Sequence, residues 1–156
     1  MKILFIGGTG IISTACAELA VQRGLDLTLL NRGHGKTIDG TRQLVADIND
    51  VASANKVLGD THWDVVVDFI SFHPDDLIKR LGIFRGKAGQ FIFISTASAY
   101  QKPIIDYLVT ESTPLVNPFW PYSRDKIDCE LYLNRELREN GFPVTIIRPS
   151  YTYGET

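Results

Sequence analysis

The chain has 156 residues, of which 44% are hydrophobic and 22% charged, a composition typical of a globular domain with one core. Its net charge of -2 excludes a general basic field for nucleic acid or anionic membrane. The apolar runs DVVVDFI and FIFIS are too short to span a bilayer. The start, MKILFIGG, enters a glycine turn at once, so we expect no signal peptide. We therefore expect a cytoplasmic protein of one domain. Cys16 and Cys129 lack the spacing of a metal or redox site, so we expect them to be reduced thiols.

Strand patterns and helix patterns alternate along the chain. The predicted strands are apolar throughout, as expected of parallel strands covered on both faces: Lys2–Ile6, Leu27–Leu30, Gln43–Val45, Val65–Phe69, Phe91–Ile94 and Val144–Ile147. The predicted helices are Ile11–Arg23, Val51–Leu58, Pro74–Phe84 and Tyr122–Asn140. Such alternation predicts an α/β protein with a doubly wound parallel sheet, a Rossmann fold of about six strands. The proline-rich stretch Gln101–Pro121 is expected to be a loop over the active face.

The first strand ends in a glycine-rich turn, within KILFIGGTGIIS. Glycines let the backbone approach a pyrophosphate, and the start of the following helix favours the anion. The third glycine of the usual motif is replaced by Ser13, which is small enough for close packing of helix on strand. The turn predicts dinucleotide binding, with a purely structural tight turn as the alternative. The predicted contacts are Gly7, Gly8, Gly10, Ile11 and Ile12.

The second predicted strand ends at Asn31 and Arg32, in TLLNRGHGK. NAD-preferring sites usually carry Asp or Glu about 20 residues after the glycines, where it accepts the ribose 2'-hydroxyl. Here no carboxylate repels a 2'-phosphate, and Arg32, together with Lys36, is placed to pair with one. The cofactor prediction is NAD(P), with NADP slightly favoured over NAD. The alternative is that Arg32 is a solvated loop residue.

The third predicted strand is followed by VADIND. Asp47 and Ile48 are expected to end this strand and to flank the adenine. The alternative is that Asp47 caps the helix that begins at Val51.

The fifth strand runs into ISTASAY, which places the hydroxyls of Ser95, Thr96 and Ser98 at the carboxyl edge of the sheet, where ligands bind. Tyr122 and Lys126 are one helical turn apart on one face. A nearby ammonium favours the phenolate, so we expect a lowered tyrosine pKa suited to proton transfer.

In this interpretation the lysine also binds the nicotinamide ribose, and Thr96 holds the substrate oxygen. The alternative is a chance pairing of Tyr122 and Lys126 on a helix.

Four segments, FIGGTGIIS, FISTASAY, YSRDK and IIRPSYTYG, resemble in order and separation the extended short-chain dehydrogenases/reductases, the family of NAD-dependent epimerases and dehydratases. The resemblance covers essentially the whole chain. It implies a catalytic set of Thr96, Tyr122 and Lys126, with Tyr122 as the general acid/base. It also implies that Gly7, Gly10, Asp47 and Ile48 hold the dinucleotide and that Pro149 lies near the nicotinamide, with Ser95 counted among the cofactor-binding residues.

Some features depart from the family pattern. Ser13 replaces a glycine, Asp125 stands where the family usually has serine, and Pro74–Phe84 has no asparagine of the kind used in a proton relay. Ser13 and the missing asparagine resemble an atypical branch, some members of which are similar to the chloroplast stem-loop RNA-binding proteins, whereas Asp125 points away from the Tyr–Lys face of its helix. Family members are also longer by about another domain. We therefore expect residues 1–156 to be the cofactor-binding part without the substrate domain, with weak binding and little turnover.

The resulting hypothesis is an NAD(P)-dependent oxidoreductase, epimerase or dehydratase that acts on a small-molecule sugar or nucleotide-sugar by Tyr–Lys assisted hydride transfer. One alternative is a non-catalytic dinucleotide-binding module for RNA or a protein partner, although the acidic balance argues against RNA. Another is a regulator similar to NADP-sensing repressors, which usually lack the Tyr–Lys pair. The resemblance also implies a homodimer through helices 74–84 and 122–140, unless their outer faces are solvated.

Overall fold

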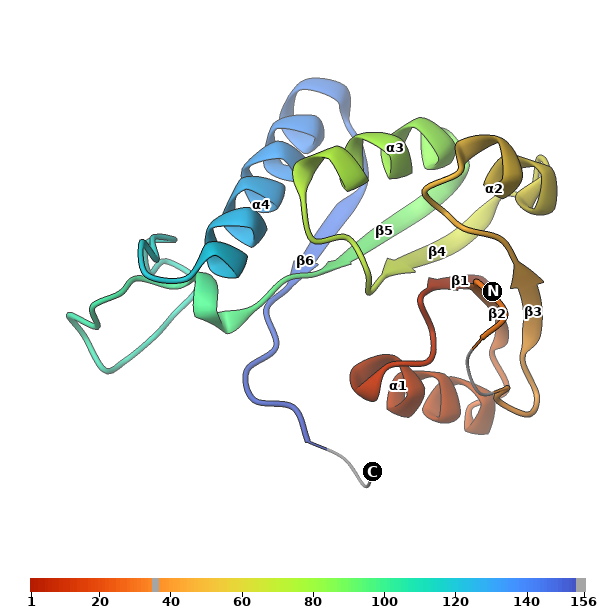
Figure 1. Ribbon diagram of the computed structural model, residues 1–156, viewed down its shortest axis with the longest axis horizontal. Helices are drawn as coiled ribbons and strands as arrows, with labels where there is room; N and C mark the ends of the chain where they lie inside the picture. Colours follow the sequence, from red (N-terminus) through yellow and green to blue (C-terminus); the bar gives the residue numbers. More distant parts are fainter. Residues whose placement is uncertain (35–36, 154–156) are drawn as a thin grey trace.

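A computed structural model describes residues 1–34 and 37–153 (Figure 1). Its strands form one six-stranded sheet in the order β3-β2-β1-β4-β5-β6, and all neighbouring strands are parallel. The predicted doubly wound α/β sheet is therefore confirmed, with several strands beginning earlier than expected. The strands are β1 (Lys2–Ile6), β2 (Asp26–Asn31), β3 (Arg42–Val45), β4 (Trp63–Asp68), β5 (Ala88–Ile94) and β6 (Val144–Ile147).

Helices cover both faces of the sheet. In Figure 1, α1 lies below the sheet, and α2, α3 and α4 lie above it. The strand order reverses at β1 and β4, which stay paired as far as Ile6 and Asp68, so the segments that follow them lead to helices on opposite faces. Open α/β sheets bind ligands in the crevice between such segments. The helices are α1 (Ile11–Gln22), α2 (Val51–Leu58), α3 (Pro74–Phe84) and α4 (Pro121–Asn140).

The helix ends follow local capping chemistry. Pro74 and Pro121 occupy first-turn positions of α3 and α4, where a missing N–H costs no hydrogen bond. Helix α4 therefore begins one residue before the predicted start, and Gly141 ends it in a left-handed conformation with φ 64°. Asp50 caps α2 by accepting from the Ser53 N–H at 3.1 Å. The suggestion that Asp47 caps this helix is therefore wrong.

Two hydrophobic clusters lie on opposite faces of the sheet. The larger one packs β1, β4 and β5 against α2, α3 and α4, and the smaller one packs β1 and β2 against α1. Strand β1 is buried on both faces from its second residue onward, as predicted. In β5 the second face is covered only in part, because Ile92 and Ile94 are half-buried against the smaller cluster whereas Phe91 and Phe93 are fully buried. For β6 the prediction is wrong. Ile147 of β6 is 45% exposed.

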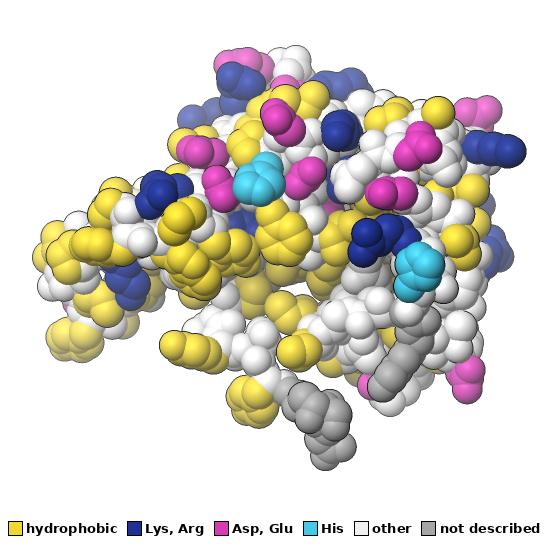
Figure 2. Space-filling model, viewed as in Figure 1, with side chains coloured by type: hydrophobic (Ala, Val, Ile, Leu, Met, Phe, Trp, Pro, Cys, Tyr) yellow, Lys and Arg dark blue, Asp and Glu magenta, His cyan; other side chains and the backbone are white. Residues whose placement is uncertain are grey.

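The segment from Gln101 to Trp120 is a loop, as predicted. Within it, Leu115 forms an isolated antiparallel bridge with Tyr100. It projects from the end of β5 beside the start of α4 (Figure 1). Hydrophobic side chains gather over this region, to the left in Figure 2. No helix within the described residues is long and apolar enough to cross a membrane.

Candidate functional site

A cavity of about 690 Å³ lies at the carboxyl ends of β1, β2, β3 and β4. Its wall combines the glycine turn after β1, the end of β2 and the loop after β3. Phe69, Ile70 and Phe72 after β4 and Ile94 of β5 also line it. The predicted cofactor residues that line this cavity are Gly7, Gly10, Ile11, Ile12, Asn31, Arg32, Asp47 and Ile48.

The turn after β1 needs glycine for steric reasons. Gly7 has φ +81°, and a Cβ there would lie 2.1 Å from Ile70 Cγ2. A Cβ on Gly8 would lie 2.7 Å from Leu29 Cδ2, so Gly8 packs on the sheet and does not line the cavity. Bare backbone therefore faces the cavity where α1 begins, and the first N–H groups of a helix have no partners within that helix.

Ser13 stabilises this turn in place of the third glycine. Its side chain is buried, and its hydroxyl accepts from the Gly10 N–H at 2.8 Å and donates to the Gly7 carbonyl at 3.0 Å. The expectation that serine permits close packing of helix on strand is confirmed. The hydroxyl also joins the two ends of the turn.

We expect Gly7→Ala to lower the free energy of unfolding by about 1–3 kcal/mol more than Gly24→Ala. Both glycines have positive φ, +81° and +68°, so both variants carry the strain of a left-handed alanine. Only at Gly7 does the added methyl meet a neighbour, since nothing lies within 4 Å of a Cβ on Gly24. Urea denaturation of both variants measures the difference, and equal losses would contradict the close approach of Ile70.

The end of β2 presents Arg32 to the cavity, beside His34. Asn31 lines the same wall, but its amide is occupied: Nδ2 donates to Gln43 Oε1 at 2.9 Å, and Oδ1 accepts from the Gly33 N–H at 2.9 Å. Asn31 therefore shapes the turn, and Arg32 is the exposed cation of this wall. Lys36, the second predicted cation, lies outside the described residues.

Asp47 and Ile48 lie in the loop after β3, which ends at Val45, so the prediction that they end the strand is wrong. Asp47 is exposed and accepts from the Asn49 N–H at 2.8 Å, whereas Ile48 is buried. Both line the cavity, as expected of residues that flank an adenine.

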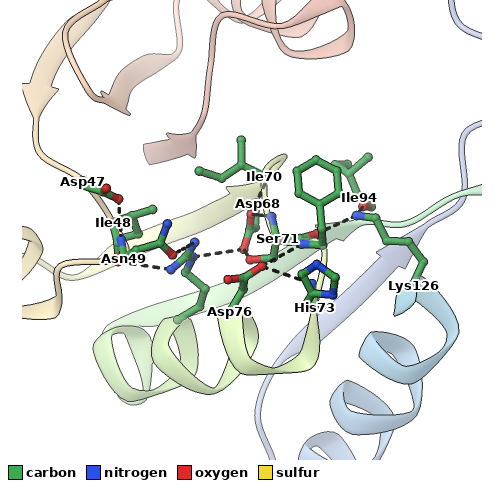
Figure 3. A network of polar contacts seen from close by, with 12 residues as sticks. Asp47, Ile48, Asn49, Asp68, Ile70, Ser71, His73, Asp76, Ile94 and Lys126 are labelled. Carbon is green, nitrogen blue, oxygen red and sulfur yellow. Dashed lines mark hydrogen bonds and ion pairs between the residues drawn. The ribbon is translucent and has the colours of Figure 1, made fainter. Parts of the chain in front are cut away.

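Lys126 is 1% exposed and does not line the cavity. Its ammonium donates to the backbone carbonyls of Ser71, at 2.7 Å, and Ile94, at 2.8 Å (Figure 3). It also lies 4.5 Å from the ring centroid of Phe93 and 4.8 Å from that of Phe72. Burial lowers the pKa of Lys126, and the nearby Asp68 carboxylate opposes this shift. The ammonium thus bridges the segment after β4 and the end of β5.

Tyr122 lies one turn before Lys126 on α4, between two aromatic residues. Its ring centroid is 6.1 Å from that of Phe72 and 4.9 Å from that of Trp120. Burial raises the pKa of Tyr122, and a hydrogen bond with the Thr96 side chain acts in the opposite direction. The expected lowering of this pKa by Lys126 is therefore wrong, because the ammonium is directed at carbonyl groups and lies 5.9 Å from the tyrosine ring centroid.

A second cavity, of about 1050 Å³, lies beyond Tyr122 under the loop after β5. Thr96, Trp120 and Pro149 line it, and it meets the first cavity at Thr152. The Thr96 hydroxyl lies 2.9 Å from that of Ser98, which in turn lies 2.8 Å from the Ser123 hydroxyl on α4. A chain of hydroxyls thus joins the end of β5 to the start of α4. Tyr122 itself lines neither cavity, but its ring contacts Phe72, which lines the first, and Trp120, which lines the second.

Ser95 is a predicted cofactor-binding residue whose hydroxyl points away from both cavities. It is buried, lines neither cavity and donates to the Glu130 carboxylate at 2.5 Å. Glu130, fully buried on α4, is paired with Arg148 at 2.6 Å. Arg148 also donates to the Tyr100 hydroxyl at 3.0 Å. Ser95 therefore belongs to a buried cluster behind the site.

Sequence reasoning missed the buried polar residues behind the cavities. Asp68 had a usable signal, because a carboxylate ends the apolar strand VVVD at the ligand-binding edge. Arg80 had none, since an arginine on an amphipathic helix is usually solvated. In the described part of the chain, no three His, Cys, Asp or Glu side chains gather so as to hold a metal ion.

The parallel order, the glycine turn and the crevice at the carboxyl ends define a Rossmann-type α/β domain. The chain belongs to the NAD dependent epimerase/dehydratase family, whose model matches residues 3–156.

Individual relatives agree with this assignment. The chain is 28% identical to a UDP-glucose 4-epimerase of Lactobacillus helveticus over 95% of its own length and 51% of the relative's. It thus spans about half the length of this curated relative. A dTDP-glucose 4,6-dehydratase from Bacillus anthracis in complex with NAD shares the fold, with a TM-score of 0.83, 20% identity and coverage of 99% of this chain and 56% of that one. A UDP-glucose 4-epimerase from Thermotoga maritima with UDP-glucose also shares the fold, with a TM-score of 0.81 and 20% identity. The match covers 95% of this chain and 55% of that one.

Proposed function

We propose that this chain binds NAD(P) in the cavity over the glycine turn and is the cofactor-binding part of an epimerase or dehydratase that acts on a nucleotide-sugar. The observation that carries the proposal is the position of Tyr122, whose ring lies between Phe72 of the first cavity and Trp120 of the second. Relatives named as UDP-glucose 4-epimerases support the substrate class. Because the chain spans about half of these relatives, residues 1–156 supply the dinucleotide site and part of the substrate cavity.

The residues around the first cavity fit a dinucleotide. Bare backbone at Gly7 and the start of α1 would hold the pyrophosphate. Asp47 and Ile48 would flank the adenine, and Arg32 would meet the ribose 2' position. When bound, the nicotinamide supplies the acceptor and donor of hydride.

In this proposal Tyr122 moves a proton to or from the substrate oxygen, and Thr96 orients that oxygen through its hydroxyl. Burial keeps the pKa of Tyr122 raised, so the phenol is protonated at neutral pH and ready to act as an acid. Lys126 holds the segment after β4 to the end of β5 and places a positive charge near the ring of Tyr122.

Arg32 tests the cofactor proposal. Arg32→Ala is expected to weaken the binding of NADPH roughly fivefold to tenfold and that of NADH less than about twofold, because only NADPH carries a 2'-phosphate. Tryptophan fluorescence of this chain, titrated with each cofactor, measures both affinities. Trp120 is 52% exposed beside Tyr122, whereas Trp63 is buried at the start of β4 and supplies a constant background.

Arg42→Ala is the matched control for this titration. Arg42 is also exposed, but it begins β3 and does not line the cavity, so its removal should leave both affinities unchanged. A wild-type chain that binds neither cofactor would overturn the proposal of a dinucleotide site. Equal losses for NADPH and NADH in Arg32→Ala would overturn the preference for NADP and leave the site itself in place.

The proposed homodimer through α3 and α4 is compatible with their outer faces. Ile78 of α3 is 52% exposed, and Leu131 and Leu137 of α4 are 61% and 43% exposed. These side chains are interspersed with charged residues, so the face is mixed in polarity.

A further inference from the structure

A buried arginine on α3 contacts the loop after β3. Arg80 lies on α3 and is 1% exposed. Its Nη1 donates to the Ile48 carbonyl at 3.2 Å, and its Nη2 donates to Asn49 Oδ1 at 3.1 Å. The guanidinium fork therefore holds two successive residues of the loop that carries Asp47 and lines the first cavity.

Asp68, at the end of β4, supplies the opposite charge. It is fully buried, with Oδ2 3.7 Å from Arg80 Nε, which has no hydrogen-bond partner among the described residues. The carboxylate also accepts from the N–H groups of Ile70, at 2.9 Å, and Ser71, at 3.0 Å. Asp68 is thus held by its own strand end and fixes the guanidinium from behind.

The same carboxylate faces the other end of the site. Ser71 donates its hydroxyl to Asp68 and accepts from Lys126 through its carbonyl. Figure 3 shows the resulting row of contacts, from Asn49 through Asp68 to Lys126. One buried ion pair therefore contacts both the loop after β3 and the segment that holds the lysine. A buried ion pair is weak evidence of stabilisation, because desolvation offsets most of its attraction, so a positioning role explains it better.

We propose that Arg80, anchored by Asp68, is a positioning residue that fixes residues 46–50 in the shape that receives the adenine half of the dinucleotide. The contacts above support the role of Arg80 in holding the loop, whereas the inference that this loop receives adenine rests on the proposed function. Without the guanidinium, no contact from α3 would hold the Ile48 carbonyl, and the loop would sample other conformations before ligand binds.

The first test needs no ligand. Arg80→Lys keeps a cation beside Asp68 but loses the two-pronged fork. The rate of amide hydrogen exchange within residues 46–50 is expected to rise about tenfold, because roughly one charge-assisted hydrogen bond is lost. The rate of exchange in β5 should stay unchanged. Arg85→Lys, at the other end of α3 and paired with Glu136, is the matched control and should leave residues 46–50 unchanged.

Asn49→Ala is the second variant, in case Arg80→Lys does not fold. Asn49 is exposed, and its removal takes away one acceptor of the fork without burying a charge. Exchange within residues 46–50 is expected to rise about threefold. Wild-type exchange at these residues in every folded variant would overturn the inference, and so would a rise that extends equally into β5.

Calorimetric titration with AMP tests the link to ligand. Arg80→Lys is expected to weaken AMP binding about tenfold, whereas Arg85→Lys should not change it. If the wild-type chain binds neither AMP nor NADPH, the proposed function fails, and the exchange data alone decide the role of Arg80. If the wild type binds AMP and Arg80→Lys binds it equally well, the inference fails and the proposed function stands.

Discussion

Tyr122→Phe is expected to lower turnover of a nucleotide-sugar by the protein that carries this chain about 10²–10⁴-fold, the usual contribution of a positioned acid or base. The affinity for NADPH should change less than about twofold, because phenylalanine keeps the ring contacts with Phe72 and Trp120. Burial raises the pKa of Tyr122, so the phenol stays protonated across the neutral range. In the direction of carbonyl reduction, the rate should therefore not fall through loss of this proton between pH 6 and pH 9.

Steady-state turnover and a cofactor titration on the same variant separate chemistry from binding. Tyr132→Phe is the matched control, because Tyr132 is on the same helix and its pKa is also raised by burial, but its polar neighbours are Glu136, Arg85 and Arg135 rather than Thr96 and Lys126. This control should retain wild-type turnover. A Tyr122→Phe protein that turns over at the wild-type rate would remove Tyr122 from the proposed mechanism.

Arg148→Met is expected to lower the free energy of unfolding by about 3–5 kcal/mol, because it leaves a buried carboxylate without its partner. Glu130 is fully buried, and Arg148 binds it through Nε, at 2.9 and 3.0 Å, and through Nη2, at 2.6 Å. The bond to Glu130 raises the pKa of Arg148, which keeps the guanidinium charged. The loss would also disturb the end of β5, since the same carboxylate accepts from Ser95.

Urea denaturation of two further variants gives this prediction its controls. Adding Glu130→Leu to Arg148→Met removes the unpaired charge and is expected to recover most of the lost stability. Lys87→Met breaks an ion pair with the fully exposed Asp60 and should leave stability unchanged within error. A single Arg148→Met variant as stable as the wild type would contradict the prediction that Glu130 depends on this partner.

Much of the fold was predictable because its signals are local. Apolar runs predicted every strand of the sheet, and Pro74 and Gly141 marked helix ends through their own backbone preferences. The glycine turn was also predictable, because Gly7 has a φ that other residues adopt only with strain. The same reasoning predicted cavity-lining positions as far as Asp47 and Ile48, since carboxyl ends of parallel strands meet at one edge.

Side-chain direction and charge environment could not be predicted in this way. The hydroxyl of Ser95 turns inward because Glu130, 35 residues later, is buried beside it. Lys126 donates to carbonyls of two strand ends, so the pKa of Tyr122 is set by burial rather than by an adjacent ammonium.

The sequence by itself therefore determined the order of strands and helices, the glycine turn and the family, because these depend on residue type and spacing. Only the tertiary structure decided which polar groups meet. Arg80 and Ile48 are separated by 32 residues, and no local pattern relates them. They come together because packing α3 on the sheet carries the arginine beneath the loop after β3, where burial leaves its donors no water to bind.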